Sequence, residues 1–150
     1  MAYWQISSGD GVVDLEYIFI KLNVALIGPG HLGDYFDHKQ EYQNLADGHI
    51  LRIFAEEVIV NDMFILKRMV NPRTHEWEIK AVGQVISPYR FEPIFERVDV
   101  SQWAMQHCRR VAWKVPKQPT IVHGGGAPIR FQRVDDSNPL MIKARELMND

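Results

Sequence analysis

The sequence predicts an α+β fold in which a mostly antiparallel, curved sheet is accompanied by a few short helices. Three observations lead to this prediction. Two strand-like segments, 62–68 and 77–87, flank the turn sequence N-P-R-T at 71–74 and so form a hairpin. An apolar run at 24–27 leads into glycines, but the next apolar residues recur at helical spacing. The chain has 150 residues, 46% of them hydrophobic, which suits a single domain with one substantial core.

The other elements are justified by their patterns and by their ends. Apolar residues within 50–58 recur every three or four positions with acids on the other side, as in an amphipathic helix. Pro116 ends the strand at 109–115, and residues 124–126 form a flexible glycine loop. The expected order is a strand at 2–7, a strand at 24–27, helices at 40–45 and 50–58, strands at 62–68, 77–87 and 109–115, an edge strand at 129–134, and a helix at 139–148 capped by Asp136, Ser137 or Asn138.

Gly28, Gly30 and Gly33 follow the strand at 24–27 with the spacing of a dinucleotide-binding fingerprint. That fold needs a helix directly after the glycines and then a second parallel strand. Residues 33–40 carry no sustained apolar stripe, and a helix is expected at 50–58 where the second strand would have to lie. The sequence therefore disfavours a nicotinamide-binding fold, and no cofactor is expected.

The cysteine and histidine content argues against disulfide and metal chemistry. Cys108 is the only cysteine, so an internal disulfide and a cysteine-rich zinc site are excluded, and this thiol is expected to be buried. The six histidines show no compact ligand spacing, so no metal is expected. The sequence has no secretory leader pattern and no apolar stretch of about 20 residues, which predicts a soluble, cytoplasmic protein without a membrane partner.

The net charge of −2 hides an asymmetry along the chain. The N-terminal third is acidic, whereas no acidic residue occurs between positions 100 and 134. A basic run of this kind can contact the phosphates of a nucleic acid, and the alternative is an ordinary solvated surface. The basic residues of this run are Arg109, Arg110, Lys114, Lys117, Arg130 and Arg133.

Several segments, in this order, resemble those of an EVE domain. They are Y-W-Q-I-S at 3–7, V-A-L-I-G at 24–28 with Gly33-Asp34, I-F at 53–54 ahead of N-D-M-F-I-L at 61–66, A-V-G-Q-V at 81–85 leading to Tyr89, and R-R-V-A-W at 109–113. EVE domains belong to the PUA-like superfamily, beside YTH and ASCH domains. The resemblance covers residues 2–116 of a single EVE-like domain spanning 1–150, with 117–150 as a C-terminal extension. The variant found at the N-terminus of AAA+ GTPase subunits of Mcr-type restriction systems is the most similar.

The resemblance implies a PUA-like (EVE/YTH) pseudobarrel that recognises a modified base without catalysis. Such a domain holds a base, flipped from DNA or unstacked from RNA, between aromatic rings. Here it implies a methylated base in DNA as ligand, no catalytic residue, and fusion to an effector such as an AAA+ GTPase and nuclease. Pro29 stands where the restriction-type members carry a pocket tryptophan. Either Pro29 itself forms that wall, or another ring such as Tyr35 or Phe36 replaces it, or the pocket has lost its ligand. The implied pocket residues are Trp4, Ser7, Gly28, Pro29, Gly30, Tyr89, Phe91 and Trp113, with Trp103 as a further available ring.

The same resemblance implies that basic side chains grip the nucleic-acid backbone next to the pocket. The residues expected to do so are Arg109, Arg110, Lys114, Lys117 and Arg130. Because strand side chains alternate, one of Arg109 and Arg110 is expected to point outward to phosphate and the other to help seal the barrel rim. Two other functions remain open from the sequence. The chain could be a PUA-like or ASCH-like RNA-binding or RNA-processing domain, or a protein adaptor whose pocket is filled by its own side chains.

Overall fold

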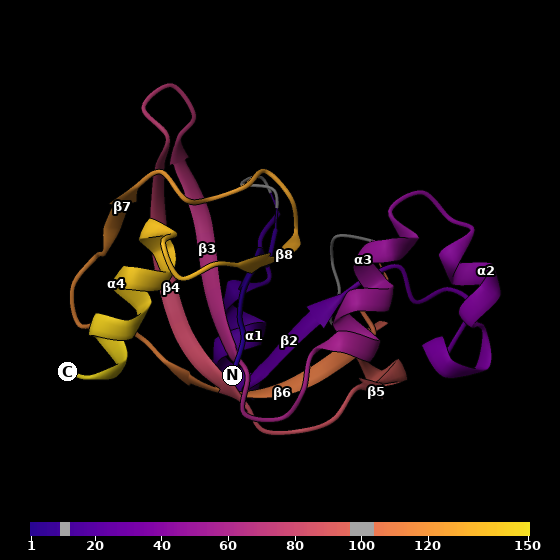
Figure 1. The fold of residues 1–150 in the computed structure, drawn as a ribbon. Helices are drawn as coiled ribbons and strands as arrows, with labels where there is room; N and C mark the ends of the chain where they lie inside the picture. The colour runs from indigo at the N-terminus through magenta and orange to yellow at the C-terminus, as the bar shows by residue number, and fades with distance from the viewer. Residues whose placement is uncertain (10–12, 97–103) are drawn as a thin grey trace.

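The computed structural model describes residues 1–9, 13–96 and 104–150, in which strands form one curled sheet with short helices (Figure 1). The elements are β1 (Tyr3–Ile6), α1 (Glu16–Leu22), β2 (Val24–Ile27), a 3-10 turn (Tyr35–Asp37), α2 (Lys39–Gln43), α3 (Gly48–Arg52) continued by a π-helical turn (Ile53–Glu57), β3 (Met63–Asn71), β4 (Glu76–Val85), β5 (Arg90–Phe91), a second 3-10 turn (Pro93–Glu96), β6 (His107–Lys114), β7 (Ile121–His123), β8 (Phe131–Val134) and α4 (Pro139–Met148).

The sheet is mixed but mostly antiparallel, and it curls into a half-barrel. Its main path runs β2-β6-β4-β3-β1-β8, with β5 added to β6 and β7 added to β4. The predicted β3–β4 hairpin is confirmed. β1 pairs in parallel with β3 and antiparallel with β8, and this parallel pairing was not predicted. The predicted α+β class with a curved sheet is therefore correct.

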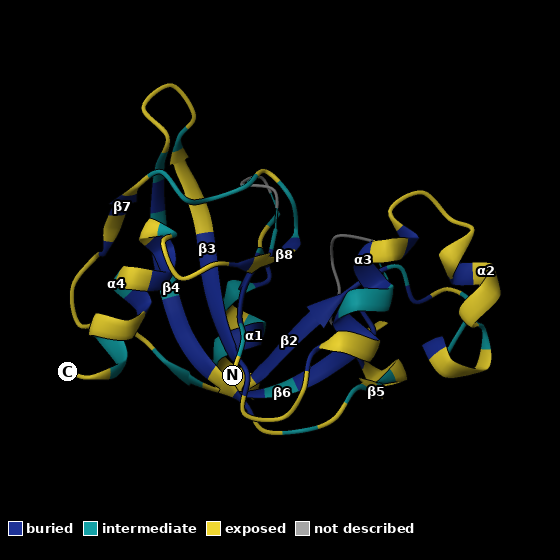
Figure 2. Cartoon of the chain, in the orientation of Figure 1, coloured by how far each residue is buried: buried dark blue, intermediate teal, exposed yellow. Residues whose placement is uncertain are grey.

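Two buried clusters lie on opposite faces of the central strands, which are buried along most of their length (Figure 2). In β3, Phe64 and Leu66 belong to the cluster inside the curl, whereas Met63 and Ile65 belong to the cluster beneath α4. This follows from the two-residue period of a strand, whose side chains alternate between faces. Each fully buried large apolar side chain contributes about 1.5–3 kcal/mol to stability.

The glycine-rich segment lies at one end of the sheet. In the described chain, β2 pairs with β6 alone, and the pairing is antiparallel, so the parallel partner required by a dinucleotide-binding fold does not follow it. This agrees with the prediction made from the helical spacing of 50–58, where α3 and the π-helical turn now lie.

The remaining differences concern short or non-local elements. α1, β5 and β7 were not predicted. The final helix begins as expected: the Asn138 side chain accepts a hydrogen bond from the Leu140 N–H at 2.8 Å, and Pro139 occupies the first helical position. β8 lies at the edge of the sheet, as predicted. None of the helices in the described ranges has the length and apolar character needed to cross a bilayer.

Candidate functional site

The loop after β2 organises the site through its carbonyl groups. The Gly28 carbonyl accepts a hydrogen bond from Arg130 Nη1 at 2.7 Å, and the Pro29 carbonyl accepts one from His107 Nε2 at 2.6 Å. A Cβ at Gly30 would lie 2.9 Å from the Ala104 backbone oxygen and 2.2 Å from Gln106 Oε1, so this close approach favours glycine. The loop is thus bonded to His107 of β6 and to Arg130, which precedes β8, and it packs against Gln106, which precedes β6.

A hydrogen-bonded chain runs from this loop through His107 to Tyr89. Because a carbonyl can only accept, the Pro29 contact requires a proton on His107 Nε2, and the neutral ring then accepts at Nδ1. The Tyr89 O–H donates to Nδ1 at 2.6 Å, and the Tyr35 backbone N–H donates to the Tyr89 oxygen at 2.9 Å. Burial lowers the pKa of His107 to about 4 and raises the pKa of Tyr89, so both groups stay neutral at pH 7.

Three aromatic rings lie at the His107–Tyr89 end of these hydrogen bonds, and each keeps part of its surface exposed. The Tyr89 ring stacks on His107 with centroids 5.7 Å apart, and the Phe91 ring lies edge-on to His107 at 5.5 Å. The Phe36 ring lies edge-on to Tyr89 at 5.4 Å and is 49% exposed. Tyr89 and Phe91 are half-buried. We refer to Phe36, Tyr89 and Phe91 as the aromatic rim.

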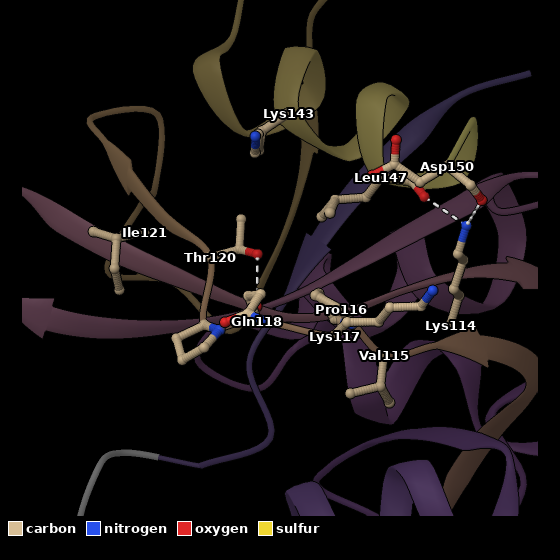
Figure 3. A pocket seen from close by; sticks show the side chains of 11 residues that line it. Lys114, Val115, Pro116, Lys117, Gln118, Thr120, Ile121, Lys143, Leu147 and Asp150 are labelled. Atoms are coloured by element: carbon tan, nitrogen blue, oxygen red, sulfur yellow. Dashed lines mark hydrogen bonds between the residues drawn. The ribbon is translucent and has the colours of Figure 1, made fainter.

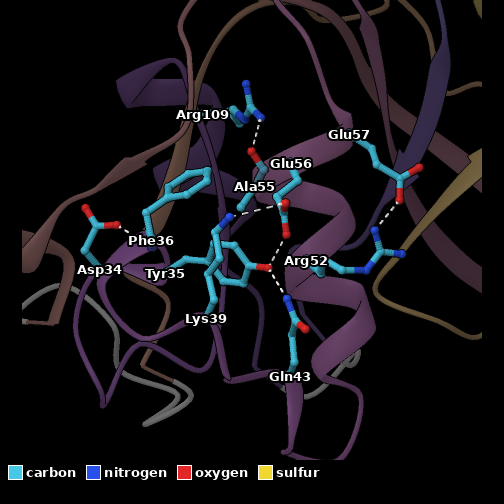
Figure 4. A network of polar contacts seen from close by, with 10 residues as sticks. All are labelled: Asp34, Tyr35, Phe36, Lys39, Gln43, Arg52, Ala55, Glu56, Glu57 and Arg109. Atoms are coloured by element: carbon cyan, nitrogen blue, oxygen red, sulfur yellow. Dashed lines mark hydrogen bonds and ion pairs between the residues drawn. The ribbon is translucent and has the colours of Figure 1, made fainter. Parts of the chain in front are cut away.

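A polar network fixes the turn that carries Phe36 (Figure 4). The Tyr35 O–H donates to the Glu56 carboxylate and accepts from Gln43 Nε2 at 2.8 Å. Lys39 lies 3.6 Å from the Glu56 carboxylate and 5.1 Å from the centroid of the Phe36 ring. Burial and the Glu56 hydrogen bond raise the pKa of Tyr35, so this hydroxyl remains a donor at neutral pH. The network therefore anchors Phe36 against the π-helical turn.

Gln106 contributes an unsatisfied polar atom next to the loop. Its side chain is 6% exposed, and its Oε1 has no hydrogen-bond partner among the described residues. A buried acceptor without a donor costs free energy. The atom is closed to solvent and packed against Gly30, so a ligand N–H reaches it only after the Gln106 side chain or the Gly30 loop shifts. This oxygen is next to Gly30, which the sequence had already assigned to the site.

Ser7 and Gly28, at the ends of β1 and β2, are joined through Arg130. The Ser7 N–H donates to the Arg130 carbonyl at 2.9 Å, while the Arg130 guanidinium contacts Gly28. Ser7 and Arg130 also line a pocket of about 310 Å³ together with Lys67 and Trp77. Arg130, expected on the phosphate-binding surface, therefore lies between the ends of these two strands.

The structure does not bring the predicted tryptophans into the site. Trp4 is 3% exposed, its ring stacks on Phe131 at 5.2 Å, and its Nε1 donates to Asp62 at 3.0 Å. Trp113 Nε1 donates to the Val24 carbonyl at 2.9 Å, at the end of β2 opposite the loop. Both are held by the core, as strand tryptophans commonly are. Trp103 lies outside the described residues.

Arg109 is a structural residue rather than a surface cation. It is 2% exposed, and its guanidinium donates to carbonyls where α3 and its π-helical turn end. Burial lowers the pKa of Arg109 to about 10, so it remains charged at neutral pH. A side chain in this position does not reach a phosphate, which corrects the expectation for this residue. The accepting carbonyls belong to Phe54, Ala55, Val58 and Ser87.

Two of the predicted backbone-binding lysines line a second pocket. Lys114 and Lys117, together with Lys143, border a cavity of about 610 Å³ between α4 and the connection after β6 (Figure 3). Lys114 Nζ donates to the Leu147 carbonyl at 2.7 Å, whereas Lys117 is exposed. Arg110 is half-buried and donates to the Leu22 carbonyl over 3.4 Å. Of the basic residues predicted for phosphate contact, Arg110 and Lys117 are the least held by contacts within the protein.

The predicted pocket residues Gly28, Pro29, Gly30, Tyr89 and Phe91 thus lie together, and Ser7 joins them through Arg130. Sequence reasoning missed the roles of His107 and Gln106, whereas Phe36 was one of the rings that it offered in place of the pocket tryptophan. His107 shares a strand face with Val111, which indicates an inward side chain, but nothing local identifies its partners Pro29 and Tyr89.

No protein-family model and no curated protein matches this chain. Within the described ranges, no group of three or more histidine, cysteine, aspartate or glutamate side chains is placed to hold a metal ion. The fold and the site therefore define the chain only as an α+β half-barrel with a partly exposed aromatic rim at the loop after β2. The function is argued from that site.

Proposed function

We propose that this chain is a non-catalytic reader of a modified nucleobase, most simply a methylated base flipped out of DNA. The observation that carries the proposal is the buried, unpaired Gln106 Oε1 beside the Gly28–Gly30 loop, which His107 links to the aromatic rim. A flipped base loses its stacking and pairing, and a reader must supply ring faces and hydrogen bonds in return. These are the two kinds of contact that this site offers.

The chemistry of a methylated exocyclic amine fits these groups. Such an amine keeps one N–H, for which Gln106 Oε1 is an acceptor, and it gains a methyl group that apolar ring faces accommodate. Discrimination against the unmethylated base through one added methyl group is worth about 1–3 kcal/mol. Arg130 and His107 hold the loop carbonyls, so the loop is positioned before the base arrives.

Backbone contact falls to Arg110 and Lys117 in this proposal, because Arg109 is buried and Lys114 is bound to α4. Each neutralised phosphate contributes about −0.9 to the slope of log K against log salt concentration. Two contacts give a slope of about −2, whereas the five residues expected from the sequence would give about −4.5. The salt dependence of DNA binding therefore distinguishes the two arrangements.

The test is binding of the chain to matched short duplexes that are unmodified or carry N6-methyladenine, 5-methylcytosine or 5-hydroxymethylcytosine. Phe36→Ala removes an exposed ring of the rim, and Gln106→Met removes the acceptor while keeping an unbranched side chain. Tyr17→Ala is the matched control, because Tyr17 is 71% exposed on α1, away from the rim.

Selective binding of one modified duplex that is lost in Phe36→Ala and Gln106→Met, and kept in Tyr17→Ala, would support the proposal. Equal, salt-sensitive binding of all duplexes would overturn base recognition. Selective binding of single-stranded RNA instead would move the assignment to the RNA-binding alternative. In the proposed setting the chain is the cytoplasmic specificity module of a modification-dependent restriction or defence system, and an AAA+ GTPase and nuclease supply the cleavage.

A further inference from the structure

Two inward-facing cations line the 310 Å³ pocket beside Ser7. Lys67 is 2% exposed, although it lies in the middle of β3, and Arg130 precedes β8 from the opposite side. A pocket of this size has room for about ten water molecules, so it can hold a small anion with part of the group that carries it. Neither cation has a role in the base contacts described above, apart from the bond of Arg130 to Gly28.

The two hydrogen bonds of Lys67 use two of its three donors and do not balance its charge. Its ammonium donates to the carbonyls of Ala127 and Ile129, the latter at 2.8 Å. The face of the Trp77 ring lies 4.7 Å from the same nitrogen. All three partners are uncharged, and burial lowers the pKa of Lys67 to about 8. A buried cation with only neutral partners keeps an uncompensated desolvation cost, which a nearby anion would offset.

Arg130 is half-buried and also donates to an uncharged partner. Its guanidinium donates to the Gly28 carbonyl, and burial lowers its pKa. Among the described residues, no carboxylate forms an ion pair with Lys67 or Arg130, whereas the neighbouring Arg68 is paired with Glu78 at 2.8 Å. The one described carboxylate that lines the pocket, Asp14, accepts hydrogen bonds from the Ser8 hydroxyl at 2.6 Å and the Glu16 N–H at 2.8 Å.

We propose that this pocket binds a phosphate-type oxyanion between the Lys67 ammonium and the Arg130 guanidinium. The Arg130 guanidinium has N–H groups beyond the one given to Gly28, and charge-assisted bonds of this kind are the strong ones. The Ser7 hydroxyl, at the pocket wall, adds a neutral donor. The anion is either free or part of a nucleic-acid backbone, and the chemistry is the same in both cases.

The experiment titrates the chain with inorganic phosphate at constant ionic strength and follows amide chemical shifts and the ¹³Cε shifts of labelled lysines. The groups that face Lys67 are Asp14, Arg68 and Arg130, so the Lys67 signal is measured against pH with and without phosphate. We expect saturable shifts in β1, in β3 and in residues 127–130. We also expect the Lys67 pKa to rise from about 8, because a bound anion favours the ammonium form.

Variants show whether the two cations are responsible. Arg130→Gln and Lys67→Met are each expected to weaken phosphate binding about tenfold, the loss of one charge-assisted contact. Lys117→Met, in the other pocket, is the control and keeps wild-type binding. If Lys67→Met does not fold, Arg130→Gln and the Lys67 titration decide. Shifts that do not saturate, or an unchanged Lys67 pKa, would overturn the site.

The same titration, repeated with a DNA duplex present, identifies the source of the anion. Competition between phosphate and duplex assigns the pocket to a backbone phosphate, and independent binding assigns it to a free oxyanion. Because the phosphate titration needs no nucleic acid, its failure would not contradict the proposed base recognition. A failure of selective duplex binding would likewise not contradict the phosphate site.

Discussion

Replacing Arg109 by methionine should destabilise the fold severely, although the sequence places this residue in a basic run. The guanidinium donates to the carbonyls of Phe54, Ala55 and Val58 at distances of 2.7–3.2 Å, and all three residues are buried. Methionine keeps an unbranched side chain against the Phe54 ring but leaves these carbonyls without a donor. The change therefore isolates the polar contribution.

The magnitude follows from two opposing contributions. These three carbonyls each lose a charged donor, at a cost of about 2 kcal/mol each, or about 6 kcal/mol together. Burial lowers the pKa of Arg109 to about 10, and that drop corresponds to roughly 3 kcal/mol of burial cost, which the substitution relieves. The free energy of unfolding should fall by about 3 kcal/mol, which lowers the Tm by about 6–12 °C for a chain of this length.

Urea unfolding followed by tryptophan fluorescence measures this loss, provided that the transition is two-state. Arg110→Met is the matched control, because its neighbouring guanidinium is only half-buried and makes one long contact of 3.4 Å. We expect that control to lie within about 0.5 kcal/mol of the wild type. A loss below 1 kcal/mol for Arg109→Met, or equal losses for the two variants, would refute the assignment of Arg109 to the end of the π-helical turn.

Three further outcomes are expected. Burial lowers the pKa of His107 to about 4, below its value in the unfolded chain, so the unfolded chain takes up the proton first as the pH falls. The free energy of unfolding should therefore fall by about 3 kcal/mol between pH 6.5 and pH 4. In urea titrations, His107→Gln should lose most of this pH dependence. Gln106→Met removes an unpaired buried oxygen and should raise the free energy of unfolding by about 1 kcal/mol; a marked loss would mean that the oxygen is satisfied. Burial raises the pKa of the Cys108 thiol to about 12, so alkylation at pH 8 should be at least about 100-fold slower in the folded than in the urea-unfolded protein, and comparable rates would contradict its burial.

The sequence predicted the local elements well, because each has a signal of its own. The β3–β4 hairpin follows from two strand patterns around a turn, and α4 has both an asparagine cap and a first-turn proline. The parallel pairing of β1 with β3 has no such signal, since about 60 residues separate the partners and neither strand encodes the other.

Part of the site was predictable by the same reasoning. Strand alternation predicts that one of Arg109 and Arg110 points inward, and Arg109 is that residue, because it shares a strand face with the core residue Val111. The contacts that assemble the site are different in kind. His107 binds a carbonyl 78 positions away, and Arg130 binds one 102 positions away, so residue spacing carries no information about either.

Backbone carbonyls bind the inward-facing cations of this chain, but these carbonyls do not offset every positive charge to the same degree. Arg109 contacts the carboxyl end of the π-helical turn after α3, and Lys114 contacts the carboxyl end of α4. Helix ends of this kind carry a partial negative charge. The carbonyls that receive Lys67 and Arg130 belong to non-helical segments, so they supply hydrogen bonds without that charge. This difference explains why an external anion is expected at Lys67 and Arg130 and not at Arg109.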